Sequence, residues 1–254
     1  MIEVHHHGDL HEIRLARPPV NALNLDLLTQ LRAVVEAAPQ QGARGLILSG
    51  GPNVFSGGLD VPYLLSCDRE GLRDCWSAFF AATRALAEAP VPVVAALAGH
   101  SPAGGCVLAL ACDYRIMARS PDPAKPFRIG LNETQVGLVV PEAIQYMMRR
   151  VLGPHRAERL MVAGAMIDAE TAARIGLVDD LVEIDDCLPR AMTWLGELAA
   201  LPQGPMLATR QLARRDLVTA LRGFDDAQMQ TFLDGWNSTD TQTALHALVA
   251  KLKK

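Results

Sequence analysis

The amino-acid sequence predicts an α/β fold, and two observations support this prediction. The first is the stretch of residues 95–118, AALAGHSPAGGCVLALACDYRIMA, which combines a strand, a glycine-rich turn, a buried helix and a second strand. Its strand begins in the β-branched, proline-bounded run of residues 91–97, and its helix, residues 106–111, is apolar on every side. The second observation is a change near residue 183, because strands alternate with helices before it and only helical patterns follow it.

The other elements follow from periodicity and from the residues that end each segment. Residues 2–7 and 10–16 read as two strands around a Gly8-Asp9 turn. We expect further strands over residues 45–49, before Ile129 and over residues 177–183. We expect helices ending near Ala38 and over residues 69–89, 141–151, 155–163 and 168–176, followed by the helical C-terminal region.

Three helix boundaries carry specific signals. Pro102, in an expected turn over residues 99–105, suits the first position of the central helix. Asp168 suits an N-cap, with Gly176 just after the end of that helix. Thr239 and Gln242 fit a capping box for the last helix.

Composition excludes several classes of protein. The 254 residues are 50% hydrophobic and 20% charged, which is enough apolar content for a large core. The net charge of -4 and the lack of a long basic run argue against a nucleic-acid partner, and no stretch has the length and apolarity of a membrane span. Five cysteines without a C-x-x-C pair, and the lack of a signal-peptide pattern, lead us to expect a reduced, cytoplasmic protein.

Two glycine-rich loops and one carboxylate stand out as candidate functional features. Residues 55–60 (FSGGLD) and 102–105 (PAGG) each follow a strand and precede a helix, where backbone N–H groups favour an anion. Glu133 lies in a mostly apolar setting within residues 129–134 (IGLNET). The sequence contains neither a phosphate-loop motif nor zinc-ligand spacing, so we expect no metal and interpret the histidines at 5–7 as part of the first strand.

These features, in this order and at this spacing, resemble the crotonase (enoyl-CoA hydratase/isomerase) superfamily. RPPVNALN at residues 17–24 and CDYRIMA at residues 112–118 extend the resemblance over nearly the whole chain. The strings PAGGC, ACDYRI and IGLNETQVG are similar in particular to the monofunctional Δ3,Δ2-enoyl-CoA isomerases.

The resemblance implies a crotonase/ClpP-like spiral of ββα units over residues 1–190. It also implies a helical C-terminal trimerisation region over residues 191–254, and assembly as a homotrimer or a dimer of trimers. Apolar positions of the C-terminal region suit packing on the core or on a neighbouring subunit: Leu233, Trp236, Leu245 and Leu248.

The resemblance assigns catalytic roles to Glu133 and to the backbone N–H groups of Leu59 and Gly104. The two N–H groups would form an oxyanion hole for the thioester oxygen of an acyl-CoA, where negative charge develops as an enolate forms. CoA is then part of the substrate, and no separate cofactor is expected. Substrate contacts are expected at Ser56, Gly57, Gly58, Leu59, Asp60, Val61, Gly104 and Asn132.

The acid/base positions distinguish an isomerase from a hydratase. Hydratases of the superfamily resemble one another in carrying two glutamates, but here the first position is Val107 and the second is Glu133. A lone carboxylate suits a proton shuttle from C2 to C4, which moves a 3-enoyl-CoA double bond to the trans-2 position, as in fatty acid β-oxidation. We expect apolar neighbours to raise the pKa of this carboxyl group by desolvation, namely Leu131, Val136, Leu138 and Val139.

Other functions remain open at this point. Within the superfamily the alternative is an enoyl-CoA hydratase or another CoA-thioester enolate enzyme. A different class is a non-catalytic acyl-CoA- or RNA-binding protein of the same fold. The run Gly99-His100-Ser101-Pro102-Ala103 also imitates the nucleophile elbow of a serine hydrolase, but Pro102 lacks the N–H that such an elbow uses after its serine.

The remaining polar residues have structural interpretations. We expect His100 to be a structural loop residue; the alternative is that it supports the inferred oxyanion hole or polarises the thioester. We expect Asp60 to cap backbone N–H groups. We expect Asp113 and Arg115 to form an internal ion pair or a trimer contact, and Glu142 to favour the start of a helix. Candidate cations for the CoA phosphates are Arg14, Arg17, Lys125, Lys251, Lys253 and Lys254.

Overall fold

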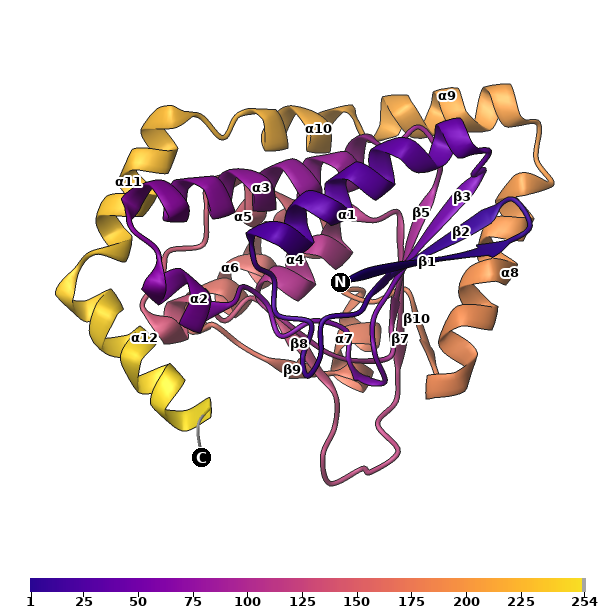
Figure 1. Ribbon diagram of the computed structural model, residues 1–254. Coiled ribbons are helices and arrows are strands. Elements are labelled where there is room, and N and C mark those ends of the chain that lie inside the picture. The colour runs from indigo at the N-terminus through magenta and orange to yellow at the C-terminus, as the bar shows by residue number, and fades with distance from the viewer. Residues whose placement is uncertain (253–254) are drawn as a thin grey trace.

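A six-stranded sheet lies at the centre of the computed structural model, which describes residues 1–252 (Figure 1). Its strands run in the order β1-β2-β3-β5-β7-β10. Their bounds are β1 Ile2–His7, β2 Leu10–Leu15, β3 Gly45–Ser49, β5 Val93–Leu97, β7 Tyr114–Ala118 and β10 Asp180–Val182. β1 and β2 form an antiparallel hairpin, and every other pair of neighbours is parallel. Parallel neighbours need a connection that crosses a face of the sheet, and helices supply it.

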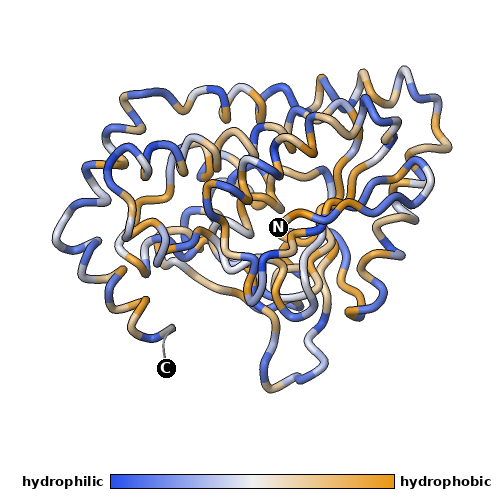
Figure 2. Tube along the Cα trace, in the orientation of Figure 1, coloured by the Kyte–Doolittle hydropathy of each residue, from blue (hydrophilic) through white to orange (hydrophobic). Residues whose placement is uncertain are grey.

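Helices cover both faces of this sheet. α1 (Leu25–Ala37) and α3 (Arg69–Glu88) pack together on one side, whereas α8 (Cys187–Ala199) packs against β3, β5 and β7 on the other (Figure 1). Every residue of β3 and β5 is buried, because a strand in the middle of a parallel sheet meets helices on both faces. Figure 2 shows hydrophobic runs along the central strands and mixed hydropathy along the outer helices.

A second, four-stranded sheet brings the candidate functional loops together. Its strands, in the order β4-β6-β8-β9, are β4 Asn53–Val54, β6 Gly99–Pro102, β8 Arg128–Gly130 and β9 Ile167–Asp168. β4 leads into the first glycine loop, β6 into the second, and β8 into the segment that carries Glu133. Because these three neighbouring strands are parallel, the segments that follow them leave the sheet at the same edge.

The turn expected over residues 99–105 is confined to one residue. Residues 99–102 form β6, Ala103 makes the turn with a φ of 44°, and α4 (Gly104–Ala111) begins at Gly104. Pro102 therefore ends a strand, and the prediction that it opens the helix is wrong. The strand extends this far because Gly99 has no side chain: a Cβ there would lie 1.9 Å from the carbonyl carbon of Asn53.

The remaining helices surround this core. Their bounds are η1 Ala38–Gln41, α2 Val61–Ser66, η2 Glu133–Val136, α5 Glu142–Leu152, α6 Pro154–Ala163, α7 Ala169–Ile175, η3 Ile184–Asp186, α9 Gln203–Ala213, α10 Arg215–Arg222, α11 Asp226–Trp236 and α12 Thr239–Leu252. The carboxylate of Asp168 caps α7, and Gly176 ends that helix in a left-handed conformation, both as predicted. The strand expected over residues 177–183 is shorter, because only residues 180–182 pair with β7.

None of the helices between residues 1 and 252 has both the length and the apolarity needed to cross a bilayer.

The C-terminal helices fold back on their own chain (Figure 1). Leu233, Trp236 and Leu245 are buried within the single chain. They therefore pack on the core of their own chain and are not exposed for contact with a neighbouring subunit. α8 begins at Cys187, which places the expected boundary at residue 190 inside a helix.

The capping box expected at the start of α12 is wrong by one residue. The hydroxyl oxygen of Ser238 accepts a hydrogen bond from the Thr241 N–H, so Ser238 caps the helix. The side-chain amide of Gln242 donates to the carbonyl of Trp236 and does not reach back to the cap. The Thr241 hydroxyl donates to the carbonyl of Gly137 at 2.5 Å, which ties α12 to the segment after Glu133.

Three ion pairs join the core to segments farther along the chain. Asp113 accepts hydrogen bonds from Arg210 and Arg214 at 2.8 to 2.9 Å, which holds α9 and α10 beside the core strands. Arg115 lies 2.7 Å from the carboxylate of Asp179. Asp113 and Arg115 thus make internal ion pairs, one of the two interpretations the sequence left open.

Replacement of Gly99 by alanine tests the pairing of β4 with β6. The added Cβ would overlap backbone atoms of Asn53, which cannot move aside as a side chain can. We expect Gly99→Ala to lower the free energy of unfolding by about 3 kcal/mol or more, measured by urea denaturation. Gly196→Ala in α8 is the control, because nothing lies within 4 Å of its added Cβ and alanine favours a helix. Equal stability of the two variants would contradict this account.

Candidate active site

A cavity of about 640 Å³ lies where the two glycine loops, η2 and α12 meet. Its lining residues are Arg17, Pro18, Pro19, Val20, Ala22, Val54, Gly57, Leu59, Asp60, Val61, Pro62, Trp76, Phe79, His100, Pro102, Ala103, Gly104, Asn132, Glu133, Val136, Leu138, Ile144 and Leu248. The cavity therefore contains the three residues to which the resemblance assigned catalysis: Leu59, Gly104 and Glu133.

The hydrogen bonds of the first glycine loop fix the direction in which the Leu59 N–H points. Leu59 forms a parallel bridge with Leu23, in which the Leu23 N–H donates to the Gly58 carbonyl at 2.8 Å and the Asp60 N–H donates to the Leu23 carbonyl at 3.0 Å. In a parallel bridge of this kind, the N–H of the central residue points to the opposite side. The Leu59 N–H is thus directed toward the second loop.

The second glycine loop places another N–H beside it. Gly104 is the first residue of α4, and the first N–H groups of a helix have no acceptor within the helix. A Cβ added to Gly104 would lie 3.4 Å from the backbone nitrogen of Leu59, so the two backbones are in close contact. Two main-chain donors at a helix N-terminus make a favourable place for negative charge.

Ser56 holds the first glycine loop in place through two hydrogen bonds of its hydroxyl group. Its side chain is fully buried; the hydroxyl donates to the Asn21 carbonyl at 2.9 Å, and its oxygen accepts from the Gly58 N–H at 3.2 Å. Ser56 and Gly58, two residues at which substrate contacts are expected, do not line the cavity. Their role is to hold the loop that presents Leu59.

Glu133 brings a buried carboxyl group into the cavity. It opens η2, only 7% of the residue is exposed, and no partner for its Oε2 lies within the described residues 1–252. Burial raises the pKa of Glu133 from 4.5 to about 7, as expected from desolvation of a carboxylate. Val136 and Leu138 share the cavity with it, but Val139 is 76% exposed, so the expectation that Val139 helps to desolvate the carboxyl group is wrong.

Asp60 is the other carboxylate that lines the cavity, and it is fully engaged. One oxygen accepts from the Tyr63 N–H at 3.0 Å and caps α2, as predicted, while the other lies 2.7 Å from Arg17. Val107, in α4, is completely buried and brings no polar group to the site. Within the described part of the chain, Glu133 is therefore the one cavity carboxylate available for proton transfer.

The cavity is lined by buried apolar residues and by exposed ones. Trp76, Phe79 and Ile144 are buried, apolar lining residues, and Leu248 of α12 is a half-buried one. Pro18, Pro19 and Val20 line the cavity and are exposed, so the cavity reaches the surface at this segment. The helices after the first loop contribute Val61, Trp76 and Phe79 to the cavity wall.

Leu248 is a lining residue that sequence reasoning missed. No local signal identifies it, because its place in the site depends on how α12 folds back over the core. The other residues expected to contact a substrate do line the cavity: Gly57, Leu59, Asp60, Val61, Gly104 and Asn132.

The candidate cations for CoA phosphates differ in position. Arg17 lines the cavity, whereas Arg14, Lys125 and Lys251 do not. Lys253 and Lys254 lie outside the described residues.

The serine-hydrolase interpretation is wrong. Ser101 is completely buried beneath the second loop and does not line the cavity. Its neighbour Pro102, which has no N–H, occupies the position where the elbow needs a donor.

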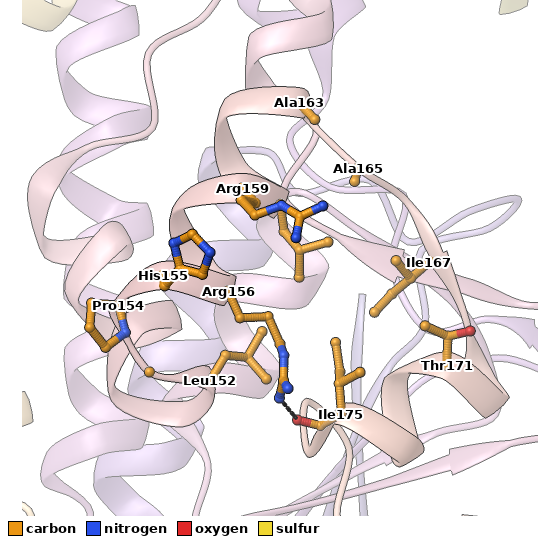
Figure 3. A pocket seen from close by; sticks show the side chains of 12 residues that line it. Leu152, Pro154, His155, Arg156, Arg159, Ala163, Ala165, Ile167, Thr171 and Ile175 are labelled. Carbon is orange, nitrogen blue, oxygen red and sulfur yellow. Dashed lines mark hydrogen bonds between the residues drawn. The ribbon is translucent and has the colours of Figure 1, made fainter.

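A separate cavity of about 750 Å³ lies between α6 and α7 (Figure 3). His155, Arg156 and Arg159 border it, and the Arg156 guanidinium donates to the Ile175 carbonyl at 3.0 Å. It contains no carboxylate and none of the predicted site residues. Nowhere in residues 1–252 do three or more His, Cys, Asp or Glu side chains gather as metal ligands would.

The fold and the site define a class of protein: an α/β protein in which two main-chain amides can hold an anion beside a buried proton acceptor. The family model described as enoyl-CoA hydratase/isomerase matches residues 6–254. The chain belongs to this family, and the crotonase fold predicted from the resemblance is confirmed.

Individual relatives agree with this assignment. The mitochondrial enoyl-CoA delta isomerase 1 of Mus musculus and that of Homo sapiens are each 31% identical over 244 residues, covering 95% of this chain and 83% and 80% of those proteins. The probable enoyl-CoA hydratase EchA17 of Mycobacterium tuberculosis is 36% identical over 184 residues, covering 71% of this chain and 67% of that protein. The crystal structure of human mitochondrial delta3-delta2-enoyl-CoA isomerase matches with a TM-score of 0.92 at 29% identity, over 99% of this chain and 98% of that one.

The buried Glu133 makes stability depend on pH in a specific direction. Its pKa is higher in the folded chain than the unperturbed 4.5, so its contribution to stability is fully present below pH 4.5 and is lost as pH rises through about 7. We expect Glu133→Gln to be more stable than the wild type at pH 8 by on the order of 2–3 kcal/mol, and about equally stable at pH 4.5. Urea denaturation at the two pH values measures this difference.

Glu142→Gln is the matched control for that experiment. Glu142 is exposed at the start of α5, so burial does not act on it as it acts on Glu133. A Glu133→Gln variant whose advantage does not grow with pH would show that the carboxyl group is not desolvated.

Proposed function

We propose that this enzyme is a Δ3,Δ2-enoyl-CoA isomerase that moves a 3-enoyl-CoA double bond to the trans-2 position. The observation that carries the proposal is Glu133, which among the described residues is the one uncommitted carboxylate of a cavity that also holds the amides of Leu59 and Gly104. The mitochondrial enoyl-CoA delta isomerases of mouse and human, each 31% identical, support it.

In the proposed reaction, Glu133 removes a proton from C2 of the bound 3-enoyl thioester. The electron pair of that C–H bond passes into the C1–C2 bond, and negative charge develops on the thioester oxygen, giving a dienolate. The N–H groups of Leu59 and Gly104 stabilise this oxygen more strongly than the neutral carbonyl, which lowers the barrier. Protonated Glu133 then returns the proton at C4, so the double bond ends between C2 and C3 and no atom is gained or lost.

The raised pKa of Glu133 suits both halves of this shuttle. A group with a pKa of about 7 accepts a proton more readily than an ordinary carboxylate and still releases it at neutral pH. Leu138, Ile144 and Leu248 are apolar and line the same cavity as Glu133, so they help to keep water away from the dienolate.

Hydration is the second candidate, because the 36% identical relative from M. tuberculosis is named a probable enoyl-CoA hydratase. Addition of water calls for one group that activates the water and another that handles a second proton. Asp60 is tied to Arg17 and to the start of α2, and Val107 is apolar, so Glu133 would have to act alone. Isomerisation is therefore the better match to this site.

A trimeric assembly, a cytoplasmic location and a place in fatty acid β-oxidation stay predictions from the sequence.

A paired substrate assay tests the proposed reaction. We expect purified protein to convert 3-hexenoyl-CoA into trans-2-hexenoyl-CoA and to hydrate crotonyl-CoA at least about 100-fold more slowly, because one carboxylate cannot perform both proton transfers of hydration. We expect Glu133→Gln to lower the isomerase kcat by at least about 1,000-fold, since an amide cannot accept the C2 proton. Absorbance of the conjugated enoyl thioester follows both reactions. Hydration faster than isomerisation would overturn the proposal.

Substitution of Gly104 tests the oxyanion hole. A Cβ at this position would lie 3.4 Å from the Leu59 nitrogen, in the space that the thioester oxygen needs. We expect Gly104→Ala to lower kcat/KM by about 100- to 1,000-fold, the usual effect of losing one oxyanion donor. Gly51→Ala is the control in the same region of the chain, because its added Cβ meets nothing closer than 3.8 Å. Full activity of Gly104→Ala would place the oxyanion elsewhere.

A further inference from the structure

His100 faces the cavity from β6. Along this strand side chains alternate, so Ser101 points into the core while His100 and Pro102 line the cavity. His100 pairs with Val54 of β4, the strand that leads into the first glycine loop. It is half-buried and lies in a strand, where the sequence led us to expect a loop.

The surroundings of His100 fix its tautomer. The Arg128 backbone N–H donates to Nδ1 at 3.1 Å, so Nδ1 must carry a lone pair and the proton of the neutral ring lies on Nε2. The ring also meets Phe127 edge-on, with 5.3 Å between centroids. Burial and the nearby Arg128 charge both lower the pKa of His100, which keeps the ring neutral. In residues 1–252 no side chain or backbone carbonyl accepts from this Nε2–H.

The position of His100 relates it to the CoA arm of the substrate and not to the reacting atoms. It lies four residues before Gly104, a separation on the order of 10 Å along an extended strand. His100 and Gly104 line the same cavity, from the strand before the second glycine loop and from the start of the helix after it. A donor in the cavity wall at this separation from the thioester needs an acceptor, and the CoA arm carries amide oxygens whereas the acyl chain is a hydrocarbon without any.

We propose that the Nε2–H of His100 donates a hydrogen bond to the second amide carbonyl of the pantetheine arm, the amide farther from the thioester. His100 is then a binding residue for the CoA portion of the ligand. The inference rests on the proposed function only in that the ligand is an acyl-CoA, which isomerase and hydratase share. A neutral donor with a fixed direction matches an amide oxygen better than a phosphate, which a cation would bind more strongly.

Two variants separate the nitrogen atoms of the ring. His100→Asn retains an acceptor near the Nδ1 position for the Arg128 N–H but has nothing at the position of Nε2. His100→Gln reaches farther and returns an amide N–H to that region. Thermal unfolding of both proteins establishes that each is folded before ligands are compared.

Binding of three saturated thioesters of increasing length tests the proposal without turnover. The ligands are hexanoyl-N-acetylcysteamine, which lacks the second amide, hexanoyl-pantetheine, which has it, and hexanoyl-CoA, which adds the nucleotide. We expect His100→Asn to raise the Kd of hexanoyl-pantetheine and hexanoyl-CoA by about threefold to tenfold, the effect of one hydrogen bond, and to leave hexanoyl-N-acetylcysteamine unchanged. We expect His100→Gln to recover most of the loss. Titration calorimetry and competition measure these values.

Each other outcome overturns the assignment. A loss confined to hexanoyl-CoA would place the contact on the nucleotide, and an equal loss for all three ligands would indicate a general distortion of the cavity. No loss, or no recovery with His100→Gln, would show that Nε2 makes no such bond. Failure of the wild type to isomerise 3-hexenoyl-CoA would count against the proposed reaction alone, because these binding constants do not depend on turnover.

Discussion

The structure depends on the close approach of two backbone segments that are about 45 residues apart in the sequence. β6 can lie against β4 only because Gly99 has no side chain, and the loops that follow these strands then meet at Gly58 and Gly104. A Cβ on Gly58 would lie 3.2 Å from the Pro102 carbonyl oxygen, which shows how little space separates the loops. This backbone contact brings two N–H groups to one point, where side chains could not set their spacing as rigidly.

The carboxyl group beside those amides is held in an unfavourable environment. Glu133 is buried and its Oε2 has no partner in the described chain, so its ionised form is destabilised relative to water. The same burial that weakens the fold at neutral pH brings the pKa of the group close to 7 and makes it a stronger base. β8, which leads into this segment, is paired with β6 on one side and β9 on the other, and the hydrogen bond from Thr241 to the Gly137 carbonyl holds the residues after Glu133 in place against this cost.

The C-terminal helices connect the periphery of the molecule to the site. The ion cluster of Asp113 with Arg210 and Arg214 fixes α9 and α10, from which α11 and α12 return toward the cavity (Figure 1). α12 then places Leu248 among the lining residues. The chain thus completes the cavity with its own last helix, and His100 presents a hydrogen-bond donor to the same cavity from β6.

Sequence alone was enough to predict the α/β class, most strands and helices, the two glycine loops and the acidic residue between apolar neighbours, because these depend on local periodicity and on the turn preferences of glycine. It could not determine that residues 99–102 continue as a strand, since that depends on how closely Asn53 approaches Gly99. It also could not place Leu248 in the cavity, remove Ser56 and Val139 from it, or orient the ring of His100. Those features arise from contacts between distant segments, and only the tertiary structure decides which side chains such contacts bury and which they leave facing a ligand.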